Sequence, residues 1–362
     1  MNPEQAKVQQ EKLEQLCDRL RHAADFLEQG REGSMRWPGE QLTWCAEAGV
    51  FRWFVPEAYG GWNWSERQQL EGYLALSQAC LTTAFVLTQW NAACKRLVVS
   101  GNSSVRQRWL PGMAEGNVFA TVGISHLTTS RQHLHQPVLA AIPAPGGGFL
   151  LRGYSPWVTG AAHADVFVVG ATLPDEHQIL CAIPKRREGV LVSPPNDLVA
   201  LSASATGEVH FREVMVDEEE VVAGPVTNVM KSGSGGGAGG LQTSTLAIGL
   251  ATAAISFLQQ QAEKRDDLVR ATEKLSADVS QLRQQVLRLA DGLEGLVSPG
   301  QLREQANSLV LRATQATLAA SKGAGFVSGH PAGRWCREAL FFLVWSCPQP
   351  VLAANLCEFA QV

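Results

Sequence analysis

Two residues in the middle of the sequence are suited to holding a flat aromatic ligand. Trp157 and Thr159 lie in the segment WVTG at 157–160, which is followed by the apolar run ADVFVV at 164–169. An indole can cover one face of a large ring system, while a hydroxyl or a backbone N–H bonds to the polar edge of that ring. The same tetrapeptide is typical of a strand end whose tryptophan packs into the core. The segment therefore has two interpretations, a ligand contact and a structural turn.

A second group of polar side chains lies in the segment GISHLTTS at 123–130. Ser125, His126 and Thr128 are neutral hydrogen-bonding groups of the kind that an active-site loop needs. A lone histidine in a loop is more often structural than catalytic, so His126 also has two interpretations.

The glycine-rich segment GGGAGG at 235–240 matches the pattern GxGxxG and precedes an expected helix. Such a pattern can hold a phosphate at a helix N-terminus. No convincing strand precedes it, however, and the stretch 232–240 is interpreted as a flexible linker or a mobile active-site loop.

The cysteines give no sign of a metal site or of a disulfide framework. Eight cysteines are scattered along the chain without a CxxC pair and without histidines at metal-ligand spacing. We expect buried free thiols, because reduced cysteine behaves as a small apolar residue, and from this a cytoplasmic location.

Charge and hydropathy exclude two further classes of partner. The chain has 362 residues and a net charge of −4, and it lacks any cluster of five or six basic residues, so we expect no nucleic-acid partner. Residues 1–30 are charged throughout and do not resemble a secretory signal. The apolar stretch 243–258 is short and rich in Thr and Ser, and it predicts a buried helix, not a membrane span.

Helix signals dominate the first third of the sequence. Asn2 caps a helix that starts at Pro3, Ser104 with Gln107 has capping-box spacing, and 83–99 predicts a helix buried on most sides. Residues 1–118 are therefore predicted to form an α-helical domain.

The rest of the chain predicts a sheet followed by a helical bundle. Short segments rich in Val, Ile, Leu and Phe, separated by turn residues, predict a small antiparallel β-barrel or sandwich over 119–226; they are 137–143, 148–154, 164–171, 177–184 and 207–213. Apolar residues spaced by three and four from Leu275 to Leu293, and a restart at Ser298-Pro299 with Gln301, predict an antiparallel helix pair within 227–362. The expected fold class is α+β in the order helices, barrel, helices.

Several segments resemble, in order, the acyl-CoA dehydrogenase superfamily. The segment FVPEAYGG at 54–61 resembles the family's "VPEEYGG", RWLP at 108–111 resembles "KYLP", and WVTG with ADVFVV resembles the flavin-site signature. GAGF at 323–326 with Pro331, Arg334 and REA at 337–339 keeps the spacing of the family's later motifs. The resemblance covers about residues 40–360.

The resemblance implies FAD as cofactor, with specific residues in contact with it. In the family, residues that match Trp157, Val158, Thr159 and Ser125 lie at the flavin, and the residue that matches Arg265 contacts FAD phosphates, often across a subunit boundary. Arg265 is also interpreted as a solvated helix residue paired with Glu263 or Asp266. The chain departs from the family at Leu268-Val269, where the family has Phe-Gly, and at Ala319, where a glutamine usually contacts FAD.

The carboxylate base of the family is missing at both of its usual positions. Nine residues beyond Arg337, Ser346 stands where most relatives have the catalytic glutamate, and the other position corresponds to GGLQ at 239–242. A serine hydroxyl has a pKa too high for a general base. Glu338 and Glu358 are the nearest carboxylates in sequence, and Glu338 is expected to form a structural ion pair.

Three functions remain open at this level. The chain resembles an FAD-dependent oxidoreductase that acts on an acyl-CoA or a similar acyl substrate and passes electrons to an acceptor. The loss of the base also fits a flavin-dependent monooxygenase that uses O2, with Ser346, Ser125, His126 and Thr128 as neutral groups around the reaction. A non-catalytic binding or assembly subunit is the third possibility, and the resemblance implies a homodimer or homotetramer.

Overall fold

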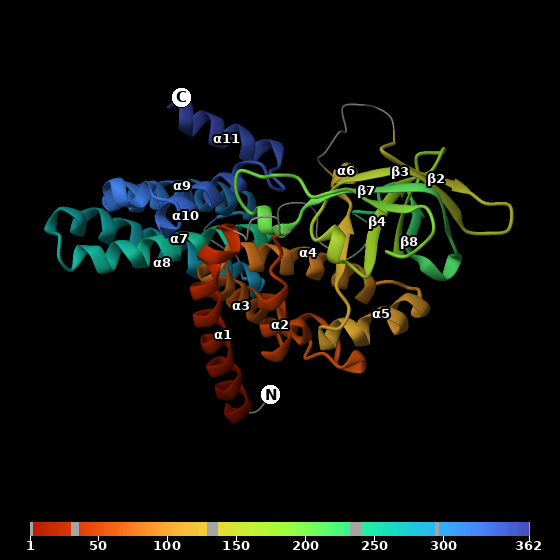
Figure 1. Cartoon of the computed structure of the whole chain (residues 1–362), viewed down its shortest axis with the longest axis horizontal. Coiled ribbons are helices and arrows are strands. Elements are labelled where there is room, and N and C mark those ends of the chain that lie inside the picture. The colour runs from red at the N-terminus through yellow and green to blue at the C-terminus, as the bar shows by residue number, and fades with distance from the viewer. Residues whose placement is uncertain (1–2, 30–35, 129–136, 232–239, 294–296, 362) are drawn as a thin grey trace.

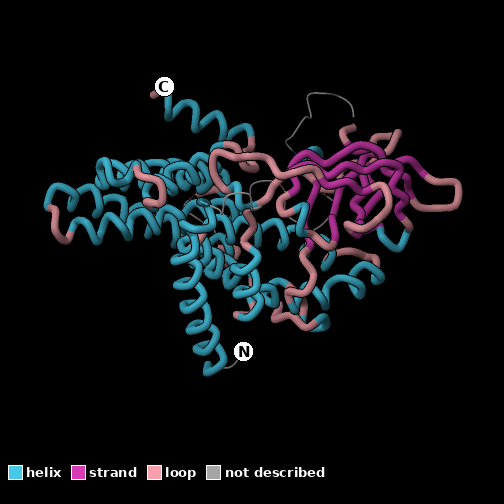
Figure 2. Tube along the Cα trace, in the orientation of Figure 1, coloured by secondary structure: helices cyan, strands magenta, loops and turns pink. Residues whose placement is uncertain are grey.

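Helices from both ends of the chain form one body, and a β-sheet made by the middle of the chain lies beside it (Figures 1 and 2). This computed structural model describes residues 3–29, 36–128, 137–231, 240–293 and 297–361. The order of helices, sheet and helices confirms the predicted fold class. The calls on Asn2 and on the glycines before Gly240 lie outside the described residues.

The elements follow the predicted segments with shifts of a few residues. The N-terminal helices are α1 (Pro3–Gln29), α2 (Gly39–Glu47), α3 (Glu66–Ala79), α4 (Leu81–Val98) and α5 (Ser103–Glu115). The strands are β1 (Ala120–Gly123), β2 (Leu139–Pro143), β3 (Phe149–Val158), β4 (Val166–Thr172), β5 (Gln178–Pro184), β6 (Val190–Val192), β7 (Gly207–Val216) and β8 (Val221–Val226), with the short helix α6 (Ser125–Thr128) after β1. The C-terminal helices are α7 (Leu241–Ala262), α8 (Val269–Ala290), α9 (Pro299–Ser321), α10 (Pro331–Leu340) and α11 (Gln349–Ala360).

Two helix starts show how the caps work in this chain. Ser298 and Gln301 form the predicted capping box at the start of α9. The predicted cap at Ser104 is wrong: α5 begins one residue earlier, and the Asn102 side chain accepts a hydrogen bond from the Ser104 N–H. The Asn102 amide also donates to the carbonyls of Glu218 and Val221, at 3.1 and 2.9 Å, so the same residue ties α5 to the β domain.

The sheet is mostly antiparallel, with strand order β6-β7-β3-β2-β4-β5-β8. It departs from the purely antiparallel expectation at β4, which pairs in parallel with β1, from Ala120 opposite Val166 to Gly123 opposite Val169, and with β2 at Ala140 opposite Thr172. β1 and β6 escaped prediction because four and three residues are too short to show an alternating pattern. β8 was also not predicted.

Strand β4 is covered on both faces. Phe167 and Val169 belong to the core inside the β domain, whereas Val166 and Val168 belong to the core shared with the helices. Because side chains alternate along a strand, one strand thus joins the two cores. This contact fixes the sheet against α4.

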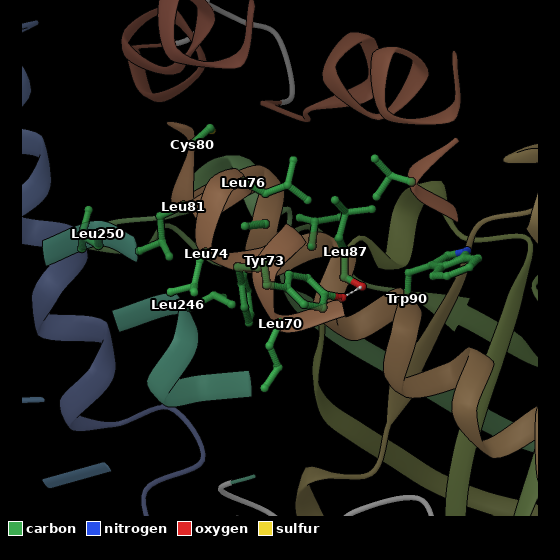
Figure 3. Packing of buried hydrophobic residues seen from close by; sticks show 14 of the residues in the cluster. Leu70, Tyr73, Leu74, Leu76, Cys80, Leu81, Leu87, Trp90, Leu246 and Leu250 are labelled. Carbon is green, nitrogen blue, oxygen red and sulfur yellow. Dashed lines mark hydrogen bonds between the residues drawn. The ribbon is translucent and has the colours of Figure 1, made fainter. Parts of the chain in front are cut away.

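The helical core is built around α3, α4 and α7, and Figure 3 shows its packing. Leu74 and Leu76 of α3 and Leu246 and Leu250 of α7 are buried together with Leu81 of α4. Among the described helices, α7 alone is long and apolar enough to cross a membrane by composition, but 72% of its most apolar window is buried in the protein. The prediction of a buried helix at 243–258 is therefore confirmed.

The seam predicted for the C-terminal helices is also confirmed. Leu275, Val279, Leu282 and Val286 are buried along α8, which packs beside α7 and α9. Leu293 falls beyond the helix and is half exposed.

The cysteines are free, as expected, but not all are buried. Cys336 and Cys347 are partly exposed and Cys357 is exposed, whereas the other five are buried. The exposed positions lie in the last helical segments, where the chain covers the bundle from outside.

Helices α3 and α7 approach each other closely at a glycine. A Cβ built on Gly249 would lie 1.9 Å from Ser77 Oγ and 2.9 Å from the Leu74 carbonyl oxygen. Any side chain at position 249 would thus push the two helices apart. By contrast, a Cβ on Gly300, in the first turn of α9, would meet only Ser298 Oγ at 3.9 Å.

We expect Gly249→Ala to lower the free energy of unfolding by about 1–3 kcal/mol through overpacking. Gly300→Ala is the matched control, because it adds the same methyl group to a helix in open space. It should leave stability unchanged or raise it by up to about 1 kcal/mol. Urea denaturation of both variants measures the difference, and equal effects would contradict a close helix contact at Gly249.

Candidate functional site

A cleft of about 260 Å³ lies where the N-terminal helices, the β domain and the C-terminal helices meet. Residues of α3 and α4 form one side, and the end of β1 with α6 and the end of β3 form another. The first turn of α7 and the turn at Trp345-Ser346 complete the lining. The cleft therefore depends on all three parts of the chain.

Trp157 lines this cleft from the end of β3, and its side chain is half exposed. The next residue, Val158, is fully buried in the core of the β domain. This alternation is the ordinary consequence of strand geometry, in which neighbouring side chains point to opposite faces. The predicted ligand contact is thus possible for Trp157, while the Val158 side chain is part of the core.

Thr159 does not line the cleft, which corrects the prediction for its hydroxyl. It is buried, and its Oγ1 lies 3.0 Å from the hydroxyl oxygen of Thr206. Its carbonyl accepts a hydrogen bond from Thr121 Oγ1 at 2.8 Å. Thr159 therefore joins three segments of the β domain, which is the structural interpretation of the motif.

Ser125 and Thr128 line the cleft from α6, as the neutral groups of this segment were predicted to do. Ser125 Oγ is buried and has no hydrogen-bond partner among the described residues. The Thr128 hydroxyl donates to the Ser125 carbonyl at 3.1 Å. Thr129 and Ser130 lie outside the described residues.

His126 points away from the cleft, so the prediction of a catalytic role is not supported. Its Nε2 lies 2.8 Å from the Gly170 carbonyl oxygen and donates a hydrogen bond to it. Burial lowers the pKa of His126, which favours the neutral ring. The side chain anchors α6 on β4.

Ser346 lies in the cleft wall in a left-handed backbone conformation, with φ of 47°. The preceding Trp345 stacks on Phe341, with ring centres 5.0 Å apart, and meets Phe85 of α4 edge-on at 5.1 Å. These aromatic contacts hold the turn that presents Ser346. The hydroxyl is thus placed where the motif spacing predicted the family's glutamate.

Arg303 of α9 supports this turn from behind and was missed in the sequence. Its Nη2 donates to the carbonyls of Phe342 and Trp345, at 3.1 and 3.0 Å, and its side chain is 1% exposed. Burial lowers its pKa to about 10. The sequence offered one signal for this role. Arg303 lies among Leu302, Ala306 and Val310, and a charged residue on an apolar helix face is usually paired with a polar partner.

The two carboxylates nearest to Ser346 in sequence lie elsewhere. Glu338 is 1% exposed and accepts two hydrogen bonds from Arg334 Nη1, at 3.0 and 3.3 Å, while Arg334 Nε donates to Asp25 at 2.9 Å. This is the expected structural ion pair, and it also fastens α10 to α1. Glu358 accepts from the Ser308 hydroxyl at 2.5 Å on a different surface.

The acidic residue among the described lining of the cleft is Glu66, the first residue of α3, and its side chain is exposed. The described part of the chain also has no group of three or more His, Cys, Asp or Glu placed to hold a metal ion. The described lining therefore has no buried carboxylate, and its other charged residues are the cations Lys95 and Arg96.

Arg265 lies outside the cleft and beyond the helix in which it was predicted. α7 ends at Ala262, and Arg265 precedes the short 3-10 helix Asp266–Leu268. Its guanidinium donates to Asp267 at 2.8 Å and to the Ala320 carbonyl at 2.7 Å, so neither Glu263 nor Asp266 is its partner. A phosphate contact across a subunit boundary stays a prediction.

Polar residues of α4 and α7 belong to the site but were not predicted. Asn91, Lys95 and Arg96 line the cleft from α4, and Gln242 lines it from α7. Asn91, Lys95 and Arg96 are spaced so that they lie on one side of α4, which could have indicated a polar site. The many apolar residues around them instead predicted a helix buried on most sides. Gly240 and Leu241 also line the cleft.

Comparison with known proteins identifies the class. Residues 2–117 match the family model for the acyl-CoA dehydrogenase N-terminal domain. The chain is 26% identical to a probable acyl-CoA dehydrogenase of Bacillus subtilis over 60% of its own length and 34% of that protein. It is 27% identical to a dibenzothiophene monooxygenase of Rhodococcus qingshengii over 49% of its length and 43% of that protein. These curated relatives are thus matched over less than half of their length.

The fold comparison extends over the whole chain. A crystal structure of an acyl-CoA dehydrogenase of Bacillus anthracis in complex with FAD has a TM-score of 0.82 and 17% identity, covering 100% of this chain and 70% of that one. The chain thus has the acyl-CoA dehydrogenase fold, and its first 117 residues match that family's N-terminal domain, which agrees with the resemblance of its motifs.

The structural role of Glu338 gives a direct test. Glu338→Gln should lower the free energy of unfolding by about 3 kcal/mol, because it leaves the buried Arg334 with only Asp25 as a charged partner. The exposed Glu358→Gln should change stability by less than about 0.5 kcal/mol. Denaturant titration measures both, and equal small effects would show that the Arg334 pair does not hold α10 to α1.

Proposed function

We propose that the chain is an FAD-dependent oxidoreductase that acts on an acyl thioester or a related carbonyl substrate. The observation that carries the proposal is the half-exposed Trp157 in the wall of a cleft that joins all three parts of the superfamily fold. The FAD complex of the Bacillus anthracis acyl-CoA dehydrogenase supports the choice of cofactor.

The described residues fit an isoalloxazine ring. Trp157 offers a flat apolar surface, and Ser125 Oγ is a buried polar atom of the lining that has no hydrogen-bond partner in the described part of the chain. The Gln242 amide also lines the cleft, where the Tyr73 hydroxyl is its neighbour. Buried polar atoms normally find a partner, so a ligand with polar edges would satisfy Ser125 Oγ. A cleft of about 260 Å³ is close to the lower end of the usual ~300–1,000 Å³ range, which suits a ring system and not a whole dinucleotide.

When bound, FAD would supply the acceptor or donor of two electrons. The chain's own groups would orient the ring and the substrate: Trp157 by covering a face, Ser125 and Gln242 by hydrogen bonds. Val122 and Ile124 of the β1 end and Leu241 of α7 give the lining apolar surface that excludes water.

A second candidate function is a flavin-dependent monooxygenase of the same fold. It is favoured by the lack of a buried carboxylate in the described lining, because α-proton removal from a thioester needs a carboxylate and that lining has only the exposed Glu66. The 27% identity with a dibenzothiophene monooxygenase is consistent with this chemistry.

Flavin binding tests the proposal directly. We expect the purified protein to show the visible absorbance bands of bound flavin after incubation with FAD. Trp157→Ala should weaken FAD binding about tenfold through the loss of stacking, on the order of 1–1.5 kcal/mol. Trp44→Ala is the control, because Trp44 contacts Arg19 on α1 and lies outside the cleft.

A colourless protein that takes up no FAD would refute the proposed function. It would instead support a non-catalytic subunit, and purification together with a flavin-bearing partner would then be the expected finding.

Ser346 distinguishes the two chemistries. With butyryl-CoA and no oxygen, Ser346→Glu should bleach bound FAD on the order of 10²-fold faster than the natural protein, because it restores a general base. Ser346→Gln is the neutral control of equal size and should bleach as slowly as the natural protein. Rapid anaerobic bleaching by the natural protein would show that a base reaches the substrate from elsewhere, and it would exclude the monooxygenase as the main activity.

A further inference from the structure

Two neighbouring cations of α4 face the same cleft. Arg96 and Lys95 both belong to its lining, and Arg96 is 7% exposed. Arg96 Nη1 donates to the Ala92 carbonyl, one turn earlier in the helix, at 2.7 Å. The Arg96 side chain forms no other hydrogen bond within the described residues.

Neither cation has a counter-ion in the described part of the chain. The ion pairs found there leave out both Arg96 and Lys95, and Glu66 is the acidic residue of the described lining. The segments 129–136 and 232–239, which lie outside the description, contain neither Asp nor Glu. Burial lowers the pKa of Arg96 to about 10, and burial also lowers the pKa of Lys95, with Glu66 opposing that effect.

Arg334 is a buried arginine with a structural role, and its partners can be compared with those of Arg96. Arg334 is as buried as Arg96, at 7% exposure, but it is paired with Glu338 and Asp25. Removing a cation from water costs free energy that a paired anion offsets. Arg303 also lacks an anion, but its Nη2 binds two carbonyl oxygens of a distant turn. Arg96 differs from both, because it lines the cleft and has one carbonyl of its own helix as its side-chain partner, so a bound anion fits there.

Lys95 and Arg96 lie near the C-terminal end of α4, whereas the turn that carries Ser346 packs near the N-terminal end of the same helix. Phe85 contacts Trp345, which precedes Ser346, and Arg96 is eleven residues further along the same helix. At 1.5 Å per residue, this separates the two backbone positions by roughly 16 Å along the helix axis. The Arg96 side chain reaches back one turn toward Ala92, and it lines the same cleft as Ser346.

We propose that Arg96, assisted by Lys95, forms an anion subsite that binds a carboxylate or phosphate group of the substrate. A guanidinium suits this task because its parallel N–H groups bind two oxygen atoms at once. The proposal deepens the proposed function and rests on it for the claim that this cleft is the substrate site. It selects, among acyl or carbonyl substrates, those with an acidic group distant from the reacting carbon.

Binding of simple anions to the full-length, flavin-free protein tests the subsite itself. We expect calorimetric titration to detect binding of succinate and inorganic phosphate but not of uncharged succinamide. Arg96→Met should weaken the binding of succinate at least about tenfold, and Lys95→Met should weaken it less. The control Arg106→Met should have no effect, because Arg106 bonds to the Ser100 carbonyl and lies outside the lining.

Stability separates a ligand-binding arginine from a structural one. Without added anion, Arg96→Met should unfold at a temperature equal to or above that of the natural protein, because the substitution removes an unpaired buried charge. Arg334→Met should unfold at a clearly lower temperature, because it leaves the buried Glu338 without its cation. A fall in the unfolding temperature of Arg96→Met as large as that of Arg334→Met would overturn the proposal. Equal affinity of the natural protein for succinate and succinamide would do so without any variant.

FAD affinity shows whether the subsite binds an anion of the substrate or the phosphates of FAD. Unchanged FAD binding by Arg96→Met, together with lost succinate binding, assigns the subsite to the substrate as proposed. A fall in FAD affinity by the same factor as the fall in phosphate affinity would assign the cations to the cofactor's phosphates and overturn the substrate assignment. Absence of FAD uptake by the natural protein would refute the proposed function, while the anion titrations would still decide the subsite.

Discussion

The close contact between α3 and α7 at Gly249 is the constraint on which the cleft depends. Ser77 Oγ sits where a Cβ would be, and it donates to the Tyr73 carbonyl at 2.6 Å, so the contact leaves no polar group of Ser77 unpaired. This approach brings helices from the two ends of the sequence into one layer. Only with that layer in place do α4 and the first turn of α7 reach the same cleft as the β domain.

Three buried arginines lie around this helical layer, and each has different partners. Arg334, paired with Glu338 and Asp25, fastens the C-terminal helix α10 to α1. Arg303 binds two carbonyl oxygens and holds the turn that presents Ser346. Arg96 and Arg303 both lack an acidic partner in the described part of the chain, but Arg303 bonds to carbonyls of a distant turn, whereas Arg96 lines the cleft and bonds to one carbonyl of its own helix.

The chemistry of the site is set by what surrounds Ser346. Ser125, Gln242 and Trp157 line the cleft together with the cations Lys95 and Arg96, while Glu338, which is close to Ser346 in sequence only, forms an ion pair outside the lining. A site of this kind can orient a flavin and a substrate but has no evident group to remove an α-proton. The fold is thus retained, while the described lining lacks a buried carboxylate of the kind that α-proton removal needs.

The sequence alone determined the order of helices, sheet and helices, the seam of α8, the capping box of α9 and the replacement of the family's glutamate by Ser346. Those features depend on local periodicity and on motif spacing, which are properties of neighbouring residues. Tertiary structure decided which side of each motif faces the cleft: Trp157 lines it, whereas the Thr159 hydroxyl bonds to Thr206 and His126 bonds to Gly170. It also revealed Arg96 and Arg303, because the burial and the partners of a charged side chain depend on segments far away in the sequence, and no local pattern contains them.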